Sequence, residues 1–130
     1  MNTYVKKIEG KGRGLFAAKT FDIGDLVLED HVIAFLDPIL KEQFIHTPLC
    51  QYGLHWPEDR SGFALVAGPS LFLNHSYSPN VIYKKDFENL LFRIECIKPI
   101  QRDEEIQFNY NGTPEDQSPL PFPWTFKIVP

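Results

Sequence analysis

The chain has 130 residues and a mass of 15.0 kDa, with 43% hydrophobic residues and a formal net charge of −4. A chain of this length is expected to form a single domain, residues 1–130. It buries about two thirds of its unfolded surface, which is enough for a hydrophobic core without disulfides or bound metal. The acidic balance disfavours nucleic acid and anionic membranes as partners and permits a basic peptide.

The cysteine content and the N-terminal segment bear on location. Cys50 and Cys96 are the two cysteines, and the chain begins without an apolar leader segment. Both observations favour a soluble protein of a reducing compartment. We therefore expect a cytoplasmic protein, or a protein of the host nucleus if the chain is viral, and not a secreted one.

The residue patterns predict a mostly β protein. Short stretches that alternate apolar and polar residues between turn residues are typical of half-buried strands. One short helix is expected at residues 39–44, ending before Pro48. The expected strands are residues 4–8, 26–29, 32–35, 81–85, 90–96 and 106–110.

A glycine-rich segment lies near the N-terminus, where Gly10, Gly12 and Gly14 alternate with Lys11 and Arg13. Glycines let a backbone bend sharply and approach a ligand closely. The segment lacks the spacing of a dinucleotide or phosphate loop. It is predicted to be a flexible hairpin turn, and a hinge that contacts a ligand is the alternative.

A polar loop interrupts the apolar pattern at residues 74–80, Asn-His-Ser-Tyr-Ser-Pro-Asn. The Asn and Ser side chains compete for nearby backbone N–H groups, and Pro79 bars a helix at Ser78, so the loop is predicted to be rigid. Binding groups are commonly carried by such loops on a β scaffold.

A second polar segment, residues 104–110, ends in a tyrosine and precedes an Asn-Gly turn. Alternation along an extended strand places Ile106, Phe108 and Tyr110 on the core face, and Asn109 with its polar neighbour on the opposite face. The Tyr110 hydroxyl is therefore expected at the rim of the core, where it needs a polar partner. A site residue and a core tyrosine bonded to the backbone are both consistent with this position.

Taken together and in this order, these segments resemble the SET-domain family of protein-lysine methyltransferases, as a small single-domain member of the bacterial or viral kind. The resemblance covers nearly the whole chain. Its specific part is the ordered occurrence of three motifs. They are residues 12–17 with 21–25 following, residues 73–76 with 79–80, and residues 97–100 leading to 104–110.

The resemblance implies a fold of several small sheets with a knot-like C-terminal crossing, and transfer of a methyl group from S-adenosylmethionine to a lysine of a protein substrate. It implies that Tyr110 is catalytic and that Tyr83 and Phe108 line the lysine channel. The degree of methylation stays open, because these two channel residues give opposite indications. The residues implied in donor binding are Lys11, Gly12, Arg13, Asn74, His75, Tyr110 and Trp124.

The C-terminal segment, residues 113–130, is rich in proline and aromatic residues. Proline fixes φ and aromatic rings give large contact area, so the segment is expected to dock on the domain. The resemblance implies that Trp124, with Phe122 close behind, closes over the adenine of the donor. Plain packing against the domain is the alternative.

Two positions depart from the family pattern. Asp103 stands where a glycine is common, and Asn109 stands where an aspartate is common. We expect altered rather than abolished activity. The alternative functions are a catalytically weak or inactive SET-like module that binds S-adenosylmethionine or a peptide, and a small β interaction module without a cofactor.

The expected partners are a protein or peptide carrying a lysine, such as a histone or another basic protein, and a second copy of the chain. Self-association is expected because so small a scaffold offers little surface for holding a peptide. No metal site is expected from His46, Cys50 and His55, because three donors separated by a proline lack a fourth ligand. Glu104 and Glu105 are expected to face opposite sides, and one of them to bond across the crossing.

Overall fold

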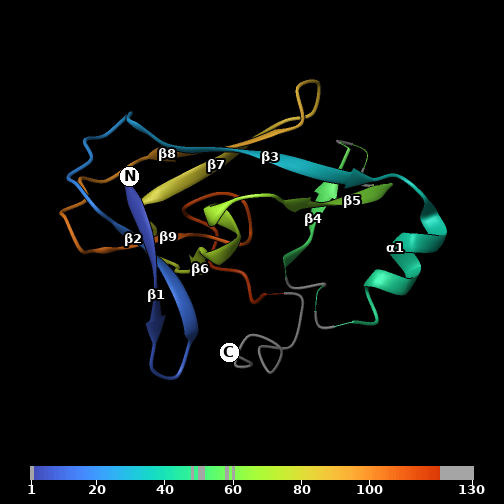
Figure 1. Ribbon diagram of the computed structural model, residues 1–130, viewed down its shortest axis with the longest axis horizontal. Helices are drawn as coiled ribbons and strands as arrows, with labels where there is room; N and C mark the ends of the chain where they lie inside the picture. The colour runs from blue at the N-terminus through green and yellow to red at the C-terminus, as the bar shows by residue number, and fades with distance from the viewer. Residues whose placement is uncertain (1, 48, 50–51, 58, 60, 121–130) are drawn as a thin grey trace.

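The structure is a computed structural model that describes residues 2–47, 49, 52–57, 59 and 61–120. Its strands form two sheets, which lie across one another and share a core (Figure 1). One α-helix, α1 (Pro38–Phe44), lies at the end of the molecule away from the N-terminal hairpin. The prediction of a mostly β protein with several sheets is confirmed.

The four-stranded sheet has the order β1 (Thr3–Ile8), β2 (Gly12–Ala17), β9 (Glu105–Phe108), β6 (Asn74–His75). Strands β1 and β2 form an antiparallel hairpin whose turn contains Gly10 with φ 80°. Strand β9 pairs antiparallel with β2 and parallel with β6. A late strand is thus inserted between two earlier ones, which brings the three motif segments of the sequence into one sheet.

The five-stranded sheet is antiparallel throughout. Its strands stand in the order β4 (Leu54–Trp56), β5 (Gly62–Val66), β3 (Leu26–Phe35), β8 (Leu91–Cys96), β7 (Val81–Asp86).

Two helical segments connect strands of this sheet. A 3₁₀ helix, η2 (Pro69–Phe72), follows β5. Helix α1 leads from β3 towards β4 and begins at a proline. It is capped by Asp37, whose side chain accepts a hydrogen bond from the Ile39 amide at 2.8 Å.

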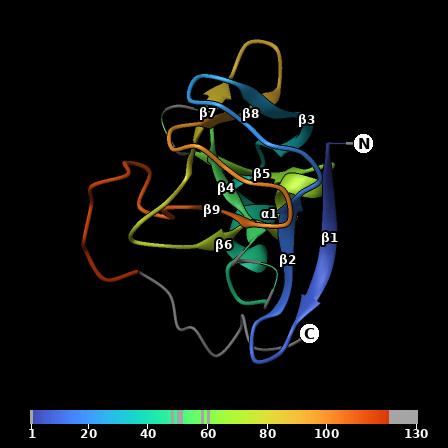
Figure 2. The ribbon, with the colours of Figure 1, turned by 90° about the vertical axis from the view of Figure 1, so that its left-hand side faces the viewer.

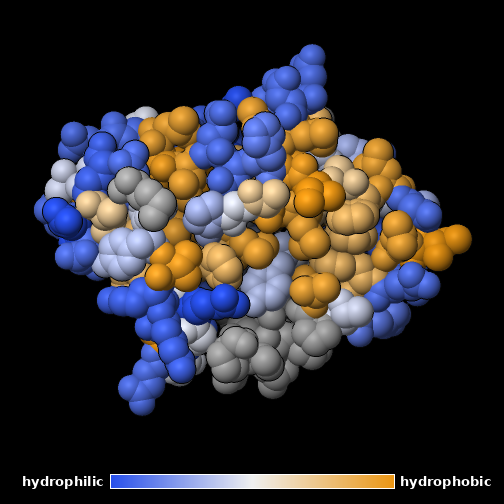
Figure 3. All heavy atoms as spheres, in the orientation of Figure 1, coloured by the Kyte–Doolittle hydropathy of each residue, from blue (hydrophilic) through white to orange (hydrophobic). Residues whose placement is uncertain are grey.

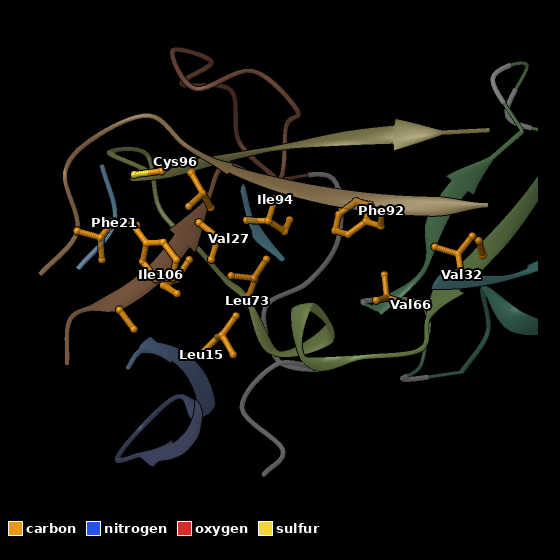
Figure 4. Close-up of a cluster of buried hydrophobic side chains, with 14 of the residues drawn as sticks. Leu15, Phe21, Val27, Val32, Val66, Leu73, Phe92, Ile94, Cys96 and Ile106 are labelled. Carbon is orange, nitrogen blue, oxygen red and sulfur yellow. The ribbon is translucent and has the colours of Figure 1, made fainter. Parts of the chain in front are cut away.

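The core lies where the two sheets meet. Leu15 of β2 and Ile106 of β9 contribute from one sheet, Ile94 of β8 contributes from the other, and all three are fully buried. Leu73, which precedes β6, lies among them (Figure 4). This position matters for the site, because the residue that anchors the start of the polar loop is itself fixed by core packing.

A buried carboxylate holds η2 against the long strand β3. Asp30 accepts hydrogen bonds from the Ser70 amide at 3.0 Å and from the Ser70 hydroxyl at 2.6 Å. Gly68 approaches this carboxylate so closely that a Cβ on it would overlap the carboxyl group of Asp30. The chain therefore enters the polar loop in a fixed direction.

Several predicted boundaries are wrong for identifiable reasons. Residues 26–29 and 32–35 belong to one strand, β3, because the polar pair between them is paired with β8. Residues 12–17 form strand β2, so the hairpin turn expected in the glycine-rich segment is confined to the residues around Gly10. Leu90 is 43% exposed, with φ 57°, and belongs to the turn before β8. Strands β4 and β5 were not predicted, whereas the helix expected at residues 39–44 is confirmed.

The segment after β9 leaves the sheet and runs beside the loop between β6 and β7, on the side away from β1 (Figure 2). Tyr77 donates a hydrogen bond from its hydroxyl to the Ser118 carbonyl, and Gln117 donates one to the Tyr77 carbonyl. The threading of a knot stays a prediction. Within the described part of the chain, no helix has the length and apolar character needed to span a membrane.

Candidate functional site

A cavity of about 90 Å³ opens between the two sheets beside the end of β9. Aromatic side chains from four separate segments form much of its wall, and the remaining wall is mainly aliphatic. Narrow apolar cavities with a few fixed polar groups are typical ligand sites. The lining residues are Tyr52, Gly53, Leu54, Val66, Ser70, Leu71, Leu73, Tyr83, Phe92, Phe108 and Tyr110.

The three aromatic residues singled out in the sequence meet in this wall. The ring centroids of Tyr83 and Phe108 lie 5.4 Å apart in an edge-to-face arrangement, with an angle of 74° between the ring planes. The ring centroids of Phe108 and Tyr110 lie 4.9 Å apart. Tyr83 also stacks on Phe92 at 5.2 Å. Such contacts fix the orientation of each ring. The structure therefore brings Tyr83, Phe108 and Tyr110 around one cavity.

Tyr110 is held at two points by the segment that forms β6. Its hydroxyl donates to the Leu73 carbonyl at 2.9 Å, and its backbone amide donates to His75 Nδ1 at 2.9 Å. The second bond requires His75 to be unprotonated at Nδ1. Tyr110 thus combines the two roles left open by the sequence: its hydroxyl bonds to backbone, and its ring lines the cavity.

Asn109, which the sequence pattern places on the face opposite Phe108 and Tyr110, is buried. Strand β9 ends at Phe108, and Asn109 is only 3% exposed although it does not line the cavity. Its side-chain amide donates to the Asp116 carbonyl at 2.7 Å, and its side-chain oxygen accepts from the Asn111 amide at 2.9 Å. The buried polar group is therefore hydrogen-bonded at both ends, as buried polar groups generally are.

A polar cluster lies beside the cavity, on the four-stranded sheet. The Asn74 side-chain amide donates to the Arg13 carbonyl at 2.9 Å and to Glu105 Oε2 at 2.8 Å. Glu105 also pairs with Lys11, with 3.6 Å between Nζ and Oε1. Of the paired glutamates, Glu105 thus forms an ion pair, and that it spans the knot-like crossing stays a prediction. The predicted donor-binding segment 11–13 and Asn74 are thereby joined in one place.

Glycines shape this cluster at two positions. Gly12 has φ 85°, a conformation in which side chains are strained. Gly14 packs so tightly that an added Cβ would lie 2.5 Å from Ile8 Cδ1 and 2.9 Å from Glu105 Oε2. Gly14 thus serves close packing within strand β2, and the predicted hairpin turn lies just before the strand, at Gly10.

Asn80 joins the polar loop to β9. Its side-chain amide donates to the Glu105 carbonyl at 2.9 Å, and its side-chain oxygen accepts from the Gln107 amide at 2.9 Å. Its backbone amide also donates to the Gln107 carbonyl at 3.1 Å. The predicted rigidity of the loop thus comes from long-range bonds as well as local ones, such as the Ser78 amide to the Ser76 hydroxyl at 2.9 Å.

The turn after Tyr110 touches the cavity wall. Gly112 has φ 104°, and a Cβ on it would lie 3.1 Å from the Tyr83 hydroxyl. A side chain at position 112 would therefore press on Tyr83. This contact ties the position of the Tyr83 hydroxyl to the turn that carries Tyr110.

Asp103 has an explanation in the backbone. Its φ is 71°, a conformation that glycine favours and that aspartate tolerates better than most residues. Its carboxylate accepts a hydrogen bond from the Tyr4 hydroxyl at 2.7 Å, which raises the pKa of Tyr4. Asp103 thus adopts a backbone conformation that a glycine would also adopt, and it adds a link to β1.

Other singled-out residues lie elsewhere. The Arg13 guanidinium covers the Phe72 ring at 4.5 Å, and His46 Nε2 lies 3.7 Å from Glu42 Oε1. Trp124, Phe122 and Cys50 lie outside the described residues. Among the residues that the structure describes, no group of three or more His, Cys, Asp or Glu side chains is arranged to hold a metal ion.

Sequence reasoning missed Tyr52 and the Leu73 carbonyl. Tyr52 is part of the cavity wall, yet it stands in a stretch without periodicity, so no pattern points to it. The Leu73 carbonyl that accepts a hydrogen bond from Tyr110 is a backbone group, so no residue pattern predicts it. The hydrogen bond between Ser70 and Asp30 joins residues 40 positions apart and is likewise not predicted by any local pattern.

The arrangement can desolvate a cation. A lysine side chain that enters an apolar aromatic cavity loses hydration, which lowers its pKa and favours the neutral amine. The oxygens of Tyr110 and Leu73 are fixed dipoles in the cavity wall. Fixed oxygens of this kind orient an amine and stabilise positive charge during a transfer reaction.

Comparisons with known proteins agree with this geometry. A family model described as the SET domain matches residues 12–111. A relative in Schizosaccharomyces pombe, the histone-lysine N-methyltransferase specific for H3 lysine 37, is 31% identical over 106 residues, which cover 82% of this chain and 71% of the relative.

Solved structures share the fold. The crystal structure of a candidate histone methyltransferase of Plasmodium falciparum superimposes with a TM-score of 0.66 at 21% identity, covering 86% of this chain and 95% of the other. A polycomb repressive complex 2 structure of Chaetomium thermophilum, bound to S-adenosylmethionine, gives a TM-score of 0.63 at 24% identity, covering 85% of this chain and 15% of the other.

Proposed function

Because the chain belongs to the SET-domain family, it is a protein-lysine methyltransferase that uses S-adenosylmethionine, and we propose that a histone is its substrate and Tyr110 its catalytic residue. The observation that carries the residue assignment is the double anchoring of Tyr110 by β6 at the wall of the aromatic cavity. The histone assignment is supported by the relative from Schizosaccharomyces pombe, which acts on histone H3. The net charge of −4 suits a basic tail.

The residues present fit the methyl donor. The polar cluster offers groups of both signs, Lys11 and Glu105, together with the amide of Asn74, and a zwitterionic amino-acid group needs such partners. We propose that these residues, with the backbone of Gly12 and Arg13 and with His75, hold the donor. Trp124, outside the described residues, is proposed to cover the adenine. When bound, S-adenosylmethionine supplies a sulfonium methyl group, which the lysine nitrogen takes as the carbon–sulfur bond breaks.

The chain supplies environment and alignment rather than a strong base. Tyr83 and Phe108 exclude water from the channel, so an entering lysine loses its proton more readily. The Tyr110 hydroxyl, fixed by its bond to Leu73, orients the amine by accepting a hydrogen bond from it. Fixed orientation lowers the entropic cost of the transfer, and fixed oxygen dipoles stabilise the charge as it moves.

Methyl transfer to recombinant histone H3 with radiolabelled donor tests the proposal. Tyr110→Phe removes one oxygen, and we expect the turnover number to fall by at least about 100-fold while donor affinity, measured by calorimetry, is retained. Tyr4→Phe is the matched control, since its hydroxyl lies on the exposed surface and bonds to Asp103. Equal loss of turnover and donor affinity in Tyr110→Phe would make Tyr110 a structural residue.

We also propose that the chain acts as a homodimer. Six exposed apolar residues gather around α1, and we call them the helix patch; Figure 3 shows apolar side chains concentrated at that end of the molecule. An isologous dimer buries the same patch of both copies. The helix patch consists of Ile33, Leu36, Ile39, Leu40, Ile45 and Leu49.

The cytoplasm, or the host nucleus for a viral chain, is proposed as the location. The buried free thiol of Cys96 and the likeness to a histone methyltransferase support a reducing compartment. Imaging of the tagged full chain in its own host tests this assignment.

A further inference from the structure

Asn109 is a buried polar residue that stands between two residues of the cavity wall. It is 3% exposed, and its neighbours Phe108 and Tyr110 both line the cavity, whereas Asn109 itself does not. Burying a polar side chain is unfavourable unless it is hydrogen-bonded. Asn109 therefore needs an explanation that neither core packing nor direct contact with the cavity provides.

The side-chain oxygen of Asn109 encloses Tyr110 in a turn. It accepts a hydrogen bond from the Asn111 backbone amide at 2.9 Å, so residues 109–111 form an Asx turn with Tyr110 at its centre. The next amide, that of Gly112, donates to the Asn109 carbonyl at 3.0 Å. The backbone of Tyr110 is thus fixed from its C-terminal side by Asn109.

The side-chain amide of Asn109 fixes the loop that follows. It donates to the Asp116 carbonyl at 2.7 Å and makes a longer contact with the Pro114 carbonyl at 3.4 Å. The Ser118 hydroxyl and backbone amide bond to the Asp116 carboxyl and lower its pKa, so the loop is ordered on its outer side as well. One side chain therefore joins the Tyr110 turn to residues 114–116.

We propose that Asn109 is the positioning residue of Tyr110, holding its backbone against β6 so that its hydroxyl meets the Leu73 carbonyl. The inference rests on the proposed catalytic role of Tyr110. The proposal depends on two hydrogen bonds that hold the backbone of Tyr110 from both sides, which we call the clamp. His75 accepts a hydrogen bond from the Tyr110 amide, and Asn109 closes the turn around Tyr110 by accepting one from the Asn111 amide. A displacement of about 1 Å at a reacting group lowers turnover by about 100-fold.

The contacts in this chain suit an amide at position 109 better than an ionised carboxylate. An aspartate would keep the oxygen that accepts from Asn111, but it would set a negative oxygen against the carbonyls of Pro114 and Asp116. Only its protonated form can donate there. Burial and facing carbonyls raise the pKa of such a carboxyl above its ordinary value of about 4.

Two variants of the full chain separate positioning from folding. Asn109→Leu removes both functions, and its turnover number should fall by about 100-fold while the dissociation constant for S-adenosylmethionine changes less than about threefold. Asn109→Asp should lose about tenfold at about pH 9. Its activity relative to the wild type should then recover as the pH falls to about 6, because protonation restores the donor.

Asn111→Asp is the matched control. It makes the same chemical change two positions away, where the side chain bonds to Ser118 at the exposed edge of the loop. We expect its turnover to stay close to wild type with no pH-dependent recovery. A flat activity ratio across pH for Asn109→Asp, or a loss of donor affinity as large as the loss of turnover in Asn109→Leu, would overturn the assignment.

Amide hydrogen exchange on the wild-type chain tests the clamp without any variant and without activity. The Asn111 amide should exchange at least about tenfold more slowly than the amide of the exposed Thr113, because Asn109 holds it. Equal exchange rates at the two amides would refute the clamp even in an active enzyme. An inactive wild-type chain with a protected Asn111 amide would refute the proposed function and retain the clamp.

Discussion

Two regions of the molecule differ in the contacts that their side chains make. We call them the crossing region, residues 73–80 with 105–118, and the helix region, residues 33–49. In the crossing region, polar side chains such as Asn80 and Asn109 bond to the backbone of other segments. In the helix region, α1 buries none of its residues, and apolar side chains face outward.

The contacts of the crossing region suit the transfer reaction, and those of the helix region suit association with another chain. Hydrogen bonds are directional and fix atoms relative to one another, which a transfer reaction needs. Apolar contact is non-directional and depends on area, which suits an association surface. Substitutions in the crossing region should therefore reduce stability and turnover, whereas substitutions in the helix region should change association and little else.

Asn80→Ala should have the largest effect on stability. It leaves the Gln107 amide and the Glu105 carbonyl without their side-chain partner, and each lost bond to a partly buried group costs about 1–2 kcal/mol. We expect the free energy of unfolding to fall by about 2–4 kcal/mol in urea denaturation. Turnover should fall with it, since β9 carries the chain into Tyr110.

Asn89→Ala is the comparison for Asn80→Ala. Asn89 bonds to Asp86 within the exposed turn between β7 and β8, so its loss should cost less than about 1 kcal/mol. If both variants lost the same stability, the distinction between the crossing region and an ordinary surface turn would fail.

Gly112→Ala should have an intermediate effect on stability and a specific effect on activity. A side chain at φ 104° is strained by about 1–2 kcal/mol, and the added Cβ presses on the Tyr83 hydroxyl. Gly24→Ala is a close control, because Gly24 has φ 94° with open space around it. We expect thermal unfolding to report similar destabilisation for both variants and methyl transfer to fall in Gly112→Ala alone. Unchanged activity in Gly112→Ala would show that the position of this turn does not affect the lysine channel.

The sequence predicts the parts of the fold that depend on local pattern. Alternation identified β7, β8 and most of β3, and the short helix expected at residues 39–44, before Pro48, corresponds to α1. Strand β2 was not among the expected strands, because its glycines, Gly12 and Gly14, have low strand propensity. The small size of Gly14 is needed by neighbours distant in sequence. Tertiary packing overrode local propensity there.

The candidate site was predictable where a residue type itself carries chemistry. Tyr110, Tyr83 and Asn74 stand out as polar or aromatic groups in ordered motifs, and the structure brings them to one cavity and its adjoining cluster. The burial of Asn109 was not predictable, because it follows from where β9 ends, and strand ends are weakly encoded. Tyr52 was missed because its approach to the cavity depends on long-range topology.

Ile39→Ser in the helix patch should have the smallest effect on the isolated chain. Ile39 is 69% exposed, so its replacement should change the free energy of unfolding by less than about 0.5 kcal/mol. A dimer formed through this patch would instead lose two copies of the contact, and sedimentation velocity should show a shift towards monomer. Ile23→Ser is the control, since Ile23 is 67% exposed but lies outside the patch. A monomeric wild-type chain, or a dimer that Ile39→Ser leaves intact, would contradict the proposed dimer surface, while the directional bonds of the crossing region would be unaffected by either result.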